Sequence, residues 1–99
     1  MENKGRYIPN NLKKFRRMYG YKQEQVTDFL GLKSTNRISR WEKGLATPSI
    51  KNLFKLSILY NTLADQLYSD HIRDIKRNMT SEEKLLVSKH LKKKRGIGK

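Results

Sequence analysis

The segment of residues 33–44 (KSTNRISRWEKG) carries side chains suited to recognising a polar, negatively charged partner. If it forms a helix, Ile38 and Trp41 lie on one side. Asn36 and Arg40 then project from the opposite side. Asn and Arg are the side chains able to form paired hydrogen bonds with adenine and guanine edges in the major groove of DNA. An ordinary solvated helix face has the same polarity, so these residues alone leave both interpretations open.

Further polar residues surround this outward face. Lys43 projects with it, Arg37 and Ser39 flank it, and Thr35 lies at its expected exposed tip. Ser and Thr hydroxyls can hydrogen-bond bases, and Thr can contact the thymine methyl group. Because the N-terminal turn of a recognition helix lies deepest in the groove, such side chains are needed at that end.

Two charged residues interrupt the apolar faces of the expected helices. Arg16 lies on the apolar stripe of the first helix, and Glu42 follows Ile38 by one helical turn on the inward side of the third. A single buried charge is costly unless it is paired. The sequence therefore predicts a partly buried Arg16–Glu42 ion pair that fixes the angle of the third helix, the alternative being that both side chains reach solvent.

Helical periodicity places two short helices ahead of this segment. The first is capped by Asn10 or Asn11 and stops at Gly20, and the second spans about residues 23–30 and stops at Gly31. The expected inward residues are Leu12, Phe15, Arg16 and Tyr19 in the first helix and Val26, Phe29 and Leu30 in the second.

Caps and turns delimit the later helices. Ser34 is expected to cap the third helix, Ser49 a fourth, and a Thr62–Asp65 pair a short fifth helix with Leu63 and Leu67. In the fourth helix the inward residues are expected to be Ile50, Leu53, Leu56 or Ser57, and Tyr60. Beyond residue 69, Thr80 and Glu83 form a capping box before a helix through Leu85, Leu86 and Leu91, and the closing KKKRGIGK is expected to be disordered.

The chain is therefore expected to be all-α. A flexible basic arm of residues 1–9 precedes a five-helix unit at 10–69, and a helical extension with a basic tail follows at 70–99. With 23 Lys and Arg against 9 acidic residues, the net charge of +14 favours a polyanionic partner, nucleic acid ahead of an anionic membrane surface.

Several other classes of protein are disfavoured. The absence of cysteine excludes disulfides and thiolate metal sites. No apolar run spans a bilayer, and the N-terminus has no secretory signal, so a cytoplasmic location is expected. His71 and His90 are isolated, and no nucleophile has a supporting base. We therefore expect no metal, no cofactor and no enzymatic activity.

Several spaced residues together resemble the lambda-repressor/Cro-type helix-turn-helix family, also called the xenobiotic-response-element type. The resemblance covers roughly residues 10–69. It is carried by an Arg in the first helix, a Gln opening the second, a Gly in the turn, the pattern I-S-x-W-E-x-G and a Pro before the fourth helix, which here are Arg16, Gln23, Gly31, residues 38–44 and Pro48.

The resemblance implies a DNA-binding domain whose third helix enters the major groove. It assigns base contacts to Thr35, Asn36 and Arg40, allows either base or backbone contacts for Arg37, and we add Ser39 to the base-reading group. Gln23 and Lys43 are implied to contact the DNA backbone, and we expect Lys22, Lys33 and Ser34 to join them. The Arg16–Glu42 pair is also a recurrent feature of the family.

This sequence departs from the family pattern at three positions. Lys33 makes the turn before the third helix one residue longer, which makes the assignment of Thr35 less secure than that of Arg40. Thr27 replaces the usual Ala. Lys22 replaces a Ser or Thr cap, at a cost of about 1 kcal/mol, but adds a cation facing DNA.

Three functions remain open at this stage. The first is a sequence-specific transcriptional regulator that binds double-stranded DNA as a homodimer. The second is an antitoxin-like interaction module whose residues 70–99 bind a protein partner while the helix-turn-helix serves autoregulation. The third is a nonspecific nucleic-acid binder driven by charge. The extension, with net charge +6, can pack on its own domain, on a second subunit or on another protein.

Overall fold

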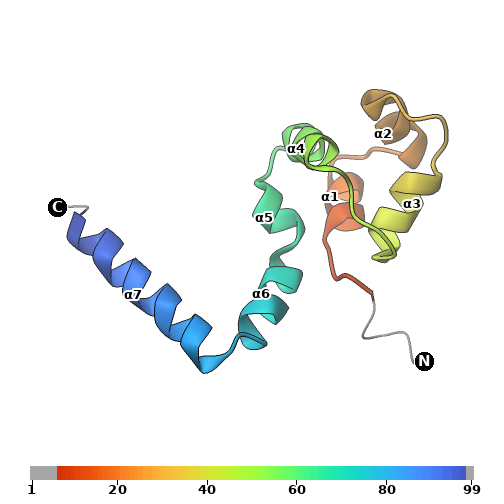
Figure 1. Ribbon diagram of the computed structural model, residues 1–99. Coiled ribbons are helices and arrows are strands. Elements are labelled where there is room, and N and C mark those ends of the chain that lie inside the picture. The colour runs from red at the N-terminus through yellow and green to blue at the C-terminus, as the bar shows by residue number, and fades with distance from the viewer. Residues whose placement is uncertain (1–6, 98–99) are drawn as a thin grey trace.

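Helices follow one another along the whole described chain. The computed structural model describes the backbone of residues 7–97 and the side chains of residues 7–89. Within these residues there are helices and no strands, as expected for an all-α protein. The helices are α1 (Leu12–Met18), α2 (Gln23–Leu30), α3 (Asn36–Lys43), α4 (Ile50–Leu59), α5 (Ala64–Leu67), α6 (Ser69–Arg77) and α7 (Ser81–Ile97). Figure 1 shows α1–α4 gathered together, α5 following α4, α6 leading away from them, and α7 projecting outward.

The core lies where α1 to α5 converge. Its buried apolar residues come from every one of these helices or from the residue that follows it: Leu12, Val26, Leu30, Ile38, Trp41, Leu56, Tyr60, Leu67 and Tyr68. Ile8, Phe15 and Leu53 are among the partly buried residues packed against this cluster. α3 contributes both Ile38 and Trp41 to this core. Their burial fixes which side of α3 faces inward, and therefore which side presents its amide and guanidinium groups to solvent.

Two adjacent asparagines join α1 to distant parts of the chain. The Asn10 side-chain amide donates to the carbonyl oxygens of Ile8 and Trp41, each at 3.0 Å, and its Oδ1 accepts from the Leu12 N–H. The Asn11 amide donates to the carbonyl of Gln66 at 3.0 Å and to the Ser69 hydroxyl at 3.2 Å. One asparagine thus ties the start of α1 to α3, and the other ties it to α5 and α6.

Several caps form as expected, and two differ. Ser49 Oγ accepts from the Asn52 N–H at 3.2 Å, and Thr80 and Glu83 form the reciprocal capping box at 3.1 and 2.9 Å. Leu63, not Thr62, is the N-cap of α5, and no side-chain hydrogen bond caps that helix, so the Thr62–Asp65 capping pair was wrong.

The start of α3 also differs from the expected one. Thr35, in a helical backbone conformation, is the N-cap in place of Ser34. The Ser34 hydroxyl still accepts from the Asn36 N–H at 3.3 Å. Ser34 therefore still accepts a hydrogen bond from the first turn of α3, but it lies one residue before the N-cap instead of being the N-cap.

Three apolar residues expected to face inward are exposed. Tyr19, Phe29 and Ile50 lie on the surface, so their predicted burial was wrong. In α4 and its C-cap the core contact is made by Leu53, Leu56, Leu59 and Tyr60, which lie on a different side of the helix from Ile50. The helix has two apolar faces, and only one of them meets the core.

The ends of the chain also depart from the expectations. Ile8, placed in the flexible arm of residues 1–9, packs on the core and donates from its N–H to the Gly44 carbonyl at 2.9 Å. Residues 1–6 of that arm lie outside the described residues. The basic tail was expected to be disordered, but α7 continues through it to Ile97. The division at residues 9 and 69 remains a prediction.

Candidate nucleic-acid interface

Helices α2 and α3 form the turn that presents the candidate recognition surface. Gly31, in the left-handed conformation with φ of 72°, ends α2, and the Leu32 N–H donates to the Thr27 carbonyl at 3.0 Å. The chain then turns and enters α3 at Asn36. The Gly31 N–H donates to the Asp28 carbonyl at 3.1 Å, so two of the last carbonyls of α2 are satisfied. A left-handed glycine closes a helix in this way without steric cost.

The outward face of α3 is free of contacts with the core. Asn36, Arg37, Arg40 and Lys43 are exposed, as expected from their spacing. Thr35 and Ser39 are half-buried, so Thr35 is less accessible than an exposed helix tip. The structure thus brings four of the predicted contact residues onto one open surface and places two at its margin.

The predicted backbone-contact residues lie around this surface. Lys22, at the start of α2, and Lys33 and Ser34, in the turn, are exposed. Lys22 has no side-chain cap hydrogen bond, but Gln25 Oε1 accepts from the Lys22 N–H at 2.8 Å, so α2 keeps one half of a capping box. The Lys22 ammonium is therefore not used in capping.

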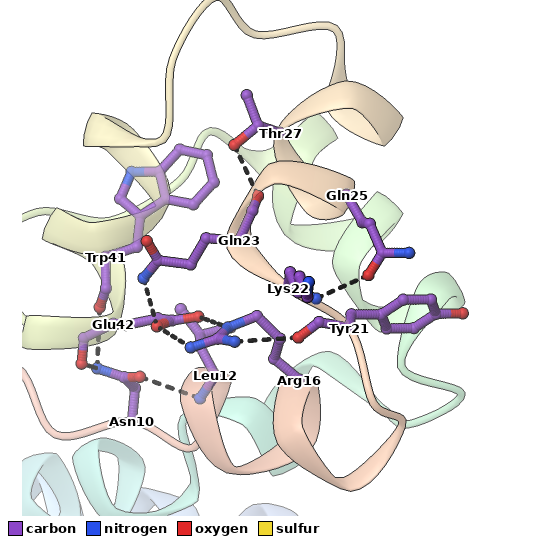
Figure 2. A network of polar contacts seen from close by, with 10 residues as sticks. All are labelled: Asn10, Leu12, Arg16, Tyr21, Lys22, Gln23, Gln25, Thr27, Trp41 and Glu42. Carbon is purple, nitrogen blue, oxygen red and sulfur yellow. Dashed lines mark hydrogen bonds and ion pairs between the residues drawn. The ribbon is translucent and has the colours of Figure 1, made fainter.

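The predicted ion pair between Arg16 and Glu42 is present (Figure 2). Arg16 Nε donates to Glu42 Oε2 at 2.6 Å and Arg16 Nη2 donates to Oε1 at 3.0 Å, a bidentate arrangement. The two side chains are only 11% and 4% exposed. The hydrogen bond to Glu42 raises the pKa of Arg16 above its ordinary value, so the guanidinium stays charged.

Two further contacts complete this network. Arg16 Nη1 donates to the Tyr21 carbonyl at 3.0 Å, and Gln23 Nε2 donates to Glu42 Oε1 at 3.0 Å. Figure 2 shows the side chains from α1, α2 and α3 meeting at this one carboxylate. The sequence predicted the charged pair but not the Gln23–Glu42 bond, because an uncharged amide at the start of a helix does not demand a buried partner as a charge does.

Gln23 is half-buried as a result of that bond. Its side-chain amide has a second N–H, and the first backbone N–H groups of any α-helix lack intrahelical partners. The start of α2 can therefore offer donors to an anion while Gln23 remains bonded to Glu42.

A depression between α3 and α4 extends the candidate surface. Arg37 and Arg40 line it from α3, and Ser49 and Asn52 line it from the start of α4. The sequence did not point to Asn52 as a contact residue, because a polar residue in the first turn of a helix does not interrupt its apolar stripe. Its position beside the two arginines makes it a further polar group available to the same ligand.

Neither a cluster of metal ligands nor a membrane-spanning helix occurs among the described residues. Within them, no three His, Asp or Glu side chains gather closely enough to hold a metal ion. Over the same residues, no helix combines the length and apolar character that crossing a bilayer requires.

Sequence comparison agrees with this geometry. The helix-turn-helix family profile HTH_3 matches residues 12–67, which is more than half of the chain and covers α1 to α5. No curated protein matches the chain. The chain therefore belongs to the lambda-repressor/Cro-like helix-turn-helix family of DNA-binding regulators.

Proposed function

We propose that this protein is a sequence-specific transcriptional regulator that reads the major groove with the outward face of α3. The observation that carries the proposal is the exposure of Asn36, Arg37 and Arg40 on a helix whose opposite side, with Ile38 and Trp41, is buried in the core. A helix fixed in this way can enter the groove without unfolding.

We assign base contacts to the N-terminal and central parts of α3. Asn36 and Arg40 can each form two hydrogen bonds with a single base, adenine and guanine respectively. Arg37 reads a base or contacts a phosphate. Thr35 and Ser39, at the half-buried margin, supply hydroxyl contacts of shorter reach.

We assign backbone contacts to the residues around this helix. The cations of Lys22, Lys33 and Lys43 are exposed around α3, and Ser34 lies beside them. Gln23 adds an amide N–H at the start of α2, where backbone N–H groups favour a phosphate. Such contacts set the register of the protein on DNA and carry no sequence information themselves.

One short recognition helix supplies few base contacts, so we propose that two copies bind a two-fold operator as a homodimer. In a cell of prokaryotic type this would occur on DNA in the cytoplasm. Repression and activation are equally compatible with this surface.

Selection from a random duplex pool tests the proposal. At about 150 mM salt, where long-range attraction is screened, the wild-type chain should enrich a two-fold sequence. The Arg40→Ala and Asn36→Ala variants should each bind that sequence about 1–3 kcal/mol more weakly and relax one base preference. Lys76→Ala, which removes one exposed cation from α6, is the matched control for charge.

Two results would contradict the proposal. If Arg40→Ala left the affinity for both selected and random duplex unchanged, α3 would not be the reading helix. If no sequence were enriched and scrambled duplexes bound equally well, the protein would be a charge-driven nonspecific binder.

A second candidate function rests on α7. All described side chains of α7, residues 81–89, are exposed, including Leu85 and Leu86, while the side chain of Leu91 lies outside the described residues. An unpacked helix with leucines on its surface suits an antitoxin-like module that holds a protein partner. A protein that copurifies with the full chain and is lost when residues 70–99 are deleted would favour this function.

A further inference from the structure

Helix α4 carries an apolar row that the core does not use. Ile50, Phe54 and Ile58 are 72%, 54% and 73% exposed. Their spacing of four residues aligns them along one side of the helix. Leu63, 66% exposed, follows just after the helix ends. Single exposed apolar residues are common on proteins, but a row of this kind marks an interaction surface.

We propose that this row, Ile50–Phe54–Ile58, is the surface through which two copies of the chain pair. The two α4 helices cross at Phe54 about a two-fold axis and run in opposite directions. The spacing argument below rests on the proposed function, but the pairing itself does not require DNA.

The sequence of the row is self-complementary. Read in either direction it is Ile, Phe, Ile at equal intervals, so an antiparallel pair brings Ile50 of each copy against Ile58 of the other and the two Phe54 rings together. A two-fold interface requires this property, since the same patch must serve both copies. Antiparallel helices also place opposite ends of their dipoles together.

Charge makes this row a better place for two copies to meet than most of the remaining surface. Two copies that each carry a net charge of +14 repel one another, and the row contains no charged residue. Lys51 and Lys55 lie to one side of it, so salt should weaken the remaining repulsion. Pairing should therefore strengthen with salt, whereas binding to DNA should weaken.

The row is small for an interface. Three side chains cover less than the roughly 800 Å² per partner that is typical of a stable complex. We therefore expect a weak dimer in solution that forms fully when two half-sites hold the copies together. The row lies on the helix that begins beside Arg37 and Arg40, so pairing there also sets the separation of the two α3 helices.

Because the chain lacks cysteine, single thiols can map this contact. In the full-length chain without DNA, Phe54→Cys should form a disulfide-linked dimer on mild oxidation at a rate about tenfold above Met18→Cys. Met18 is a matched control because it is an apolar residue on another helix, α1, and its 64% exposure is no lower than the 54% of Phe54. The rate should rise with sodium chloride.

A mixing experiment tests the direction of the helices. Two copies of residue 50 would be about 12 Å apart along the antiparallel pair, beyond the reach of a disulfide. Ile50→Cys and Ile58→Cys should therefore crosslink when mixed and not when separate. A parallel pair would instead link Ile50→Cys to itself, which would overturn this arrangement.

Equal rates for Phe54→Cys and Met18→Cys would overturn the proposal even if the chain bound a selected duplex. Conversely, crosslinking through Phe54→Cys in a chain that enriches no DNA sequence would leave the pairing standing and remove the proposed function. In sedimentation the wild-type mass should rise with concentration, and Phe54→Glu should remain a monomer. A Phe54→Glu variant that dimerises like the wild type would also exclude this surface.

Discussion

Glu42 holds Arg16 and Gln23 at the same time, with Oε2 accepting from Arg16 Nε at 2.6 Å and Oε1 accepting from Gln23 Nε2 at 3.0 Å. The three residues come from α3, α1 and α2. A single carboxylate therefore joins the helix that carries the candidate base contacts to both α1 and α2. Together with the burial of Ile38 and Trp41, these bonds hold the helix that carries the candidate recognition surface.

Replacing Glu42 should destabilise the fold strongly. Glu42→Leu leaves the Arg16 guanidinium buried without its carboxylate, a change that typically costs about 3–5 kcal/mol. Urea unfolding followed by circular dichroism measures the loss. A midpoint unchanged from the wild type would show that the pair contributes no net stability.

The double variant Arg16→Met/Glu42→Leu is the control for this prediction. It removes the uncompensated charge and leaves an apolar pair of similar volume, which is often as stable as the original ion pair. We therefore expect it to be more stable than Glu42→Leu alone. If the double variant were the weaker of the two, loss of packing would explain the effect better than the unpaired charge.

Sequence periodicity located the ion pair because each charged residue interrupts an apolar stripe. The same reasoning predicted that Phe29 and Ile50 are buried, and this was wrong, because both are exposed. α4 has apolar residues on two sides, and a pattern within one helix cannot say which side the rest of the chain covers. Leu53, Leu56 and Tyr60 meet the core, and the row beginning at Ile50 does not.

Contacts between distant residues escaped prediction for a related reason. Asn10 was expected only as one of two possible helix caps, but its amide also reaches the Trp41 carbonyl 31 residues away. Ser34 and Thr35 are both acceptable caps by residue type, so the sequence could not distinguish them, and Thr35 is the one at which α3 begins. The identities of the outward residues of α3 were predictable because they depend only on helical spacing once Trp41 is known to be buried.

Two glycines with the same conformation should respond differently to substitution. Gly31 and Gly44 both have positive φ, 72° and 80°. A Cβ on Gly31 would meet nothing, whereas one on Gly44 would collide with the Ile8 carbonyl oxygen and lie 2.7 Å from the Ile8 nitrogen. We expect Gly31→Ala to cost about 1 kcal/mol, the strain of a left-handed residue.

Gly44→Ala should lower the free energy of unfolding more than Gly31→Ala does. The Ile8 backbone must move, and its hydrogen bond to the Gly44 carbonyl is disturbed. Thermal unfolding of the two variants, measured side by side, separates conformational strain from collision. Equal losses would mean that the segment around Ile8 adjusts freely.

Gln23 is expected to act on affinity without acting on sequence preference. We expect Gln23→Ala to weaken binding to selected and random duplexes by the same factor, about 1–2 kcal/mol, since it removes the donor that we propose contacts the DNA backbone. Gln23→Glu should be worse, because it places a second carboxylate beside Glu42 and near a phosphate. A fluorescence titration against both duplexes measures each change, and a loss confined to the selected duplex would assign Gln23 to base reading.

Tyr68 should make the fold sensitive to alkaline pH. Its side chain is nine-tenths buried, its hydroxyl has no hydrogen-bond partner among the described residues, and burial raises its pKa from 10 to about 12. The folded state thus keeps a proton that the unfolded chain releases. The stability linked to this group is fully present below about pH 10 and is lost as the pH rises toward 12, by about 2 kcal/mol.

Tyr68→Phe should therefore have two effects. At neutral pH it removes an unpaired buried hydroxyl, so we expect stability equal to the wild type or higher by about 1 kcal/mol. Between about pH 10 and 12 the variant should lose less stability than the wild type. Part of the loss should remain in the variant, because burial also raises the pKa of Tyr60. Tyr19→Phe, at an exposed position, is the control and should follow the wild type. Urea midpoints measured across this range test whether Tyr68 causes the alkaline loss of stability. If the midpoint of Tyr68→Phe fell as steeply with pH as that of the control, Tyr68 would not be the cause.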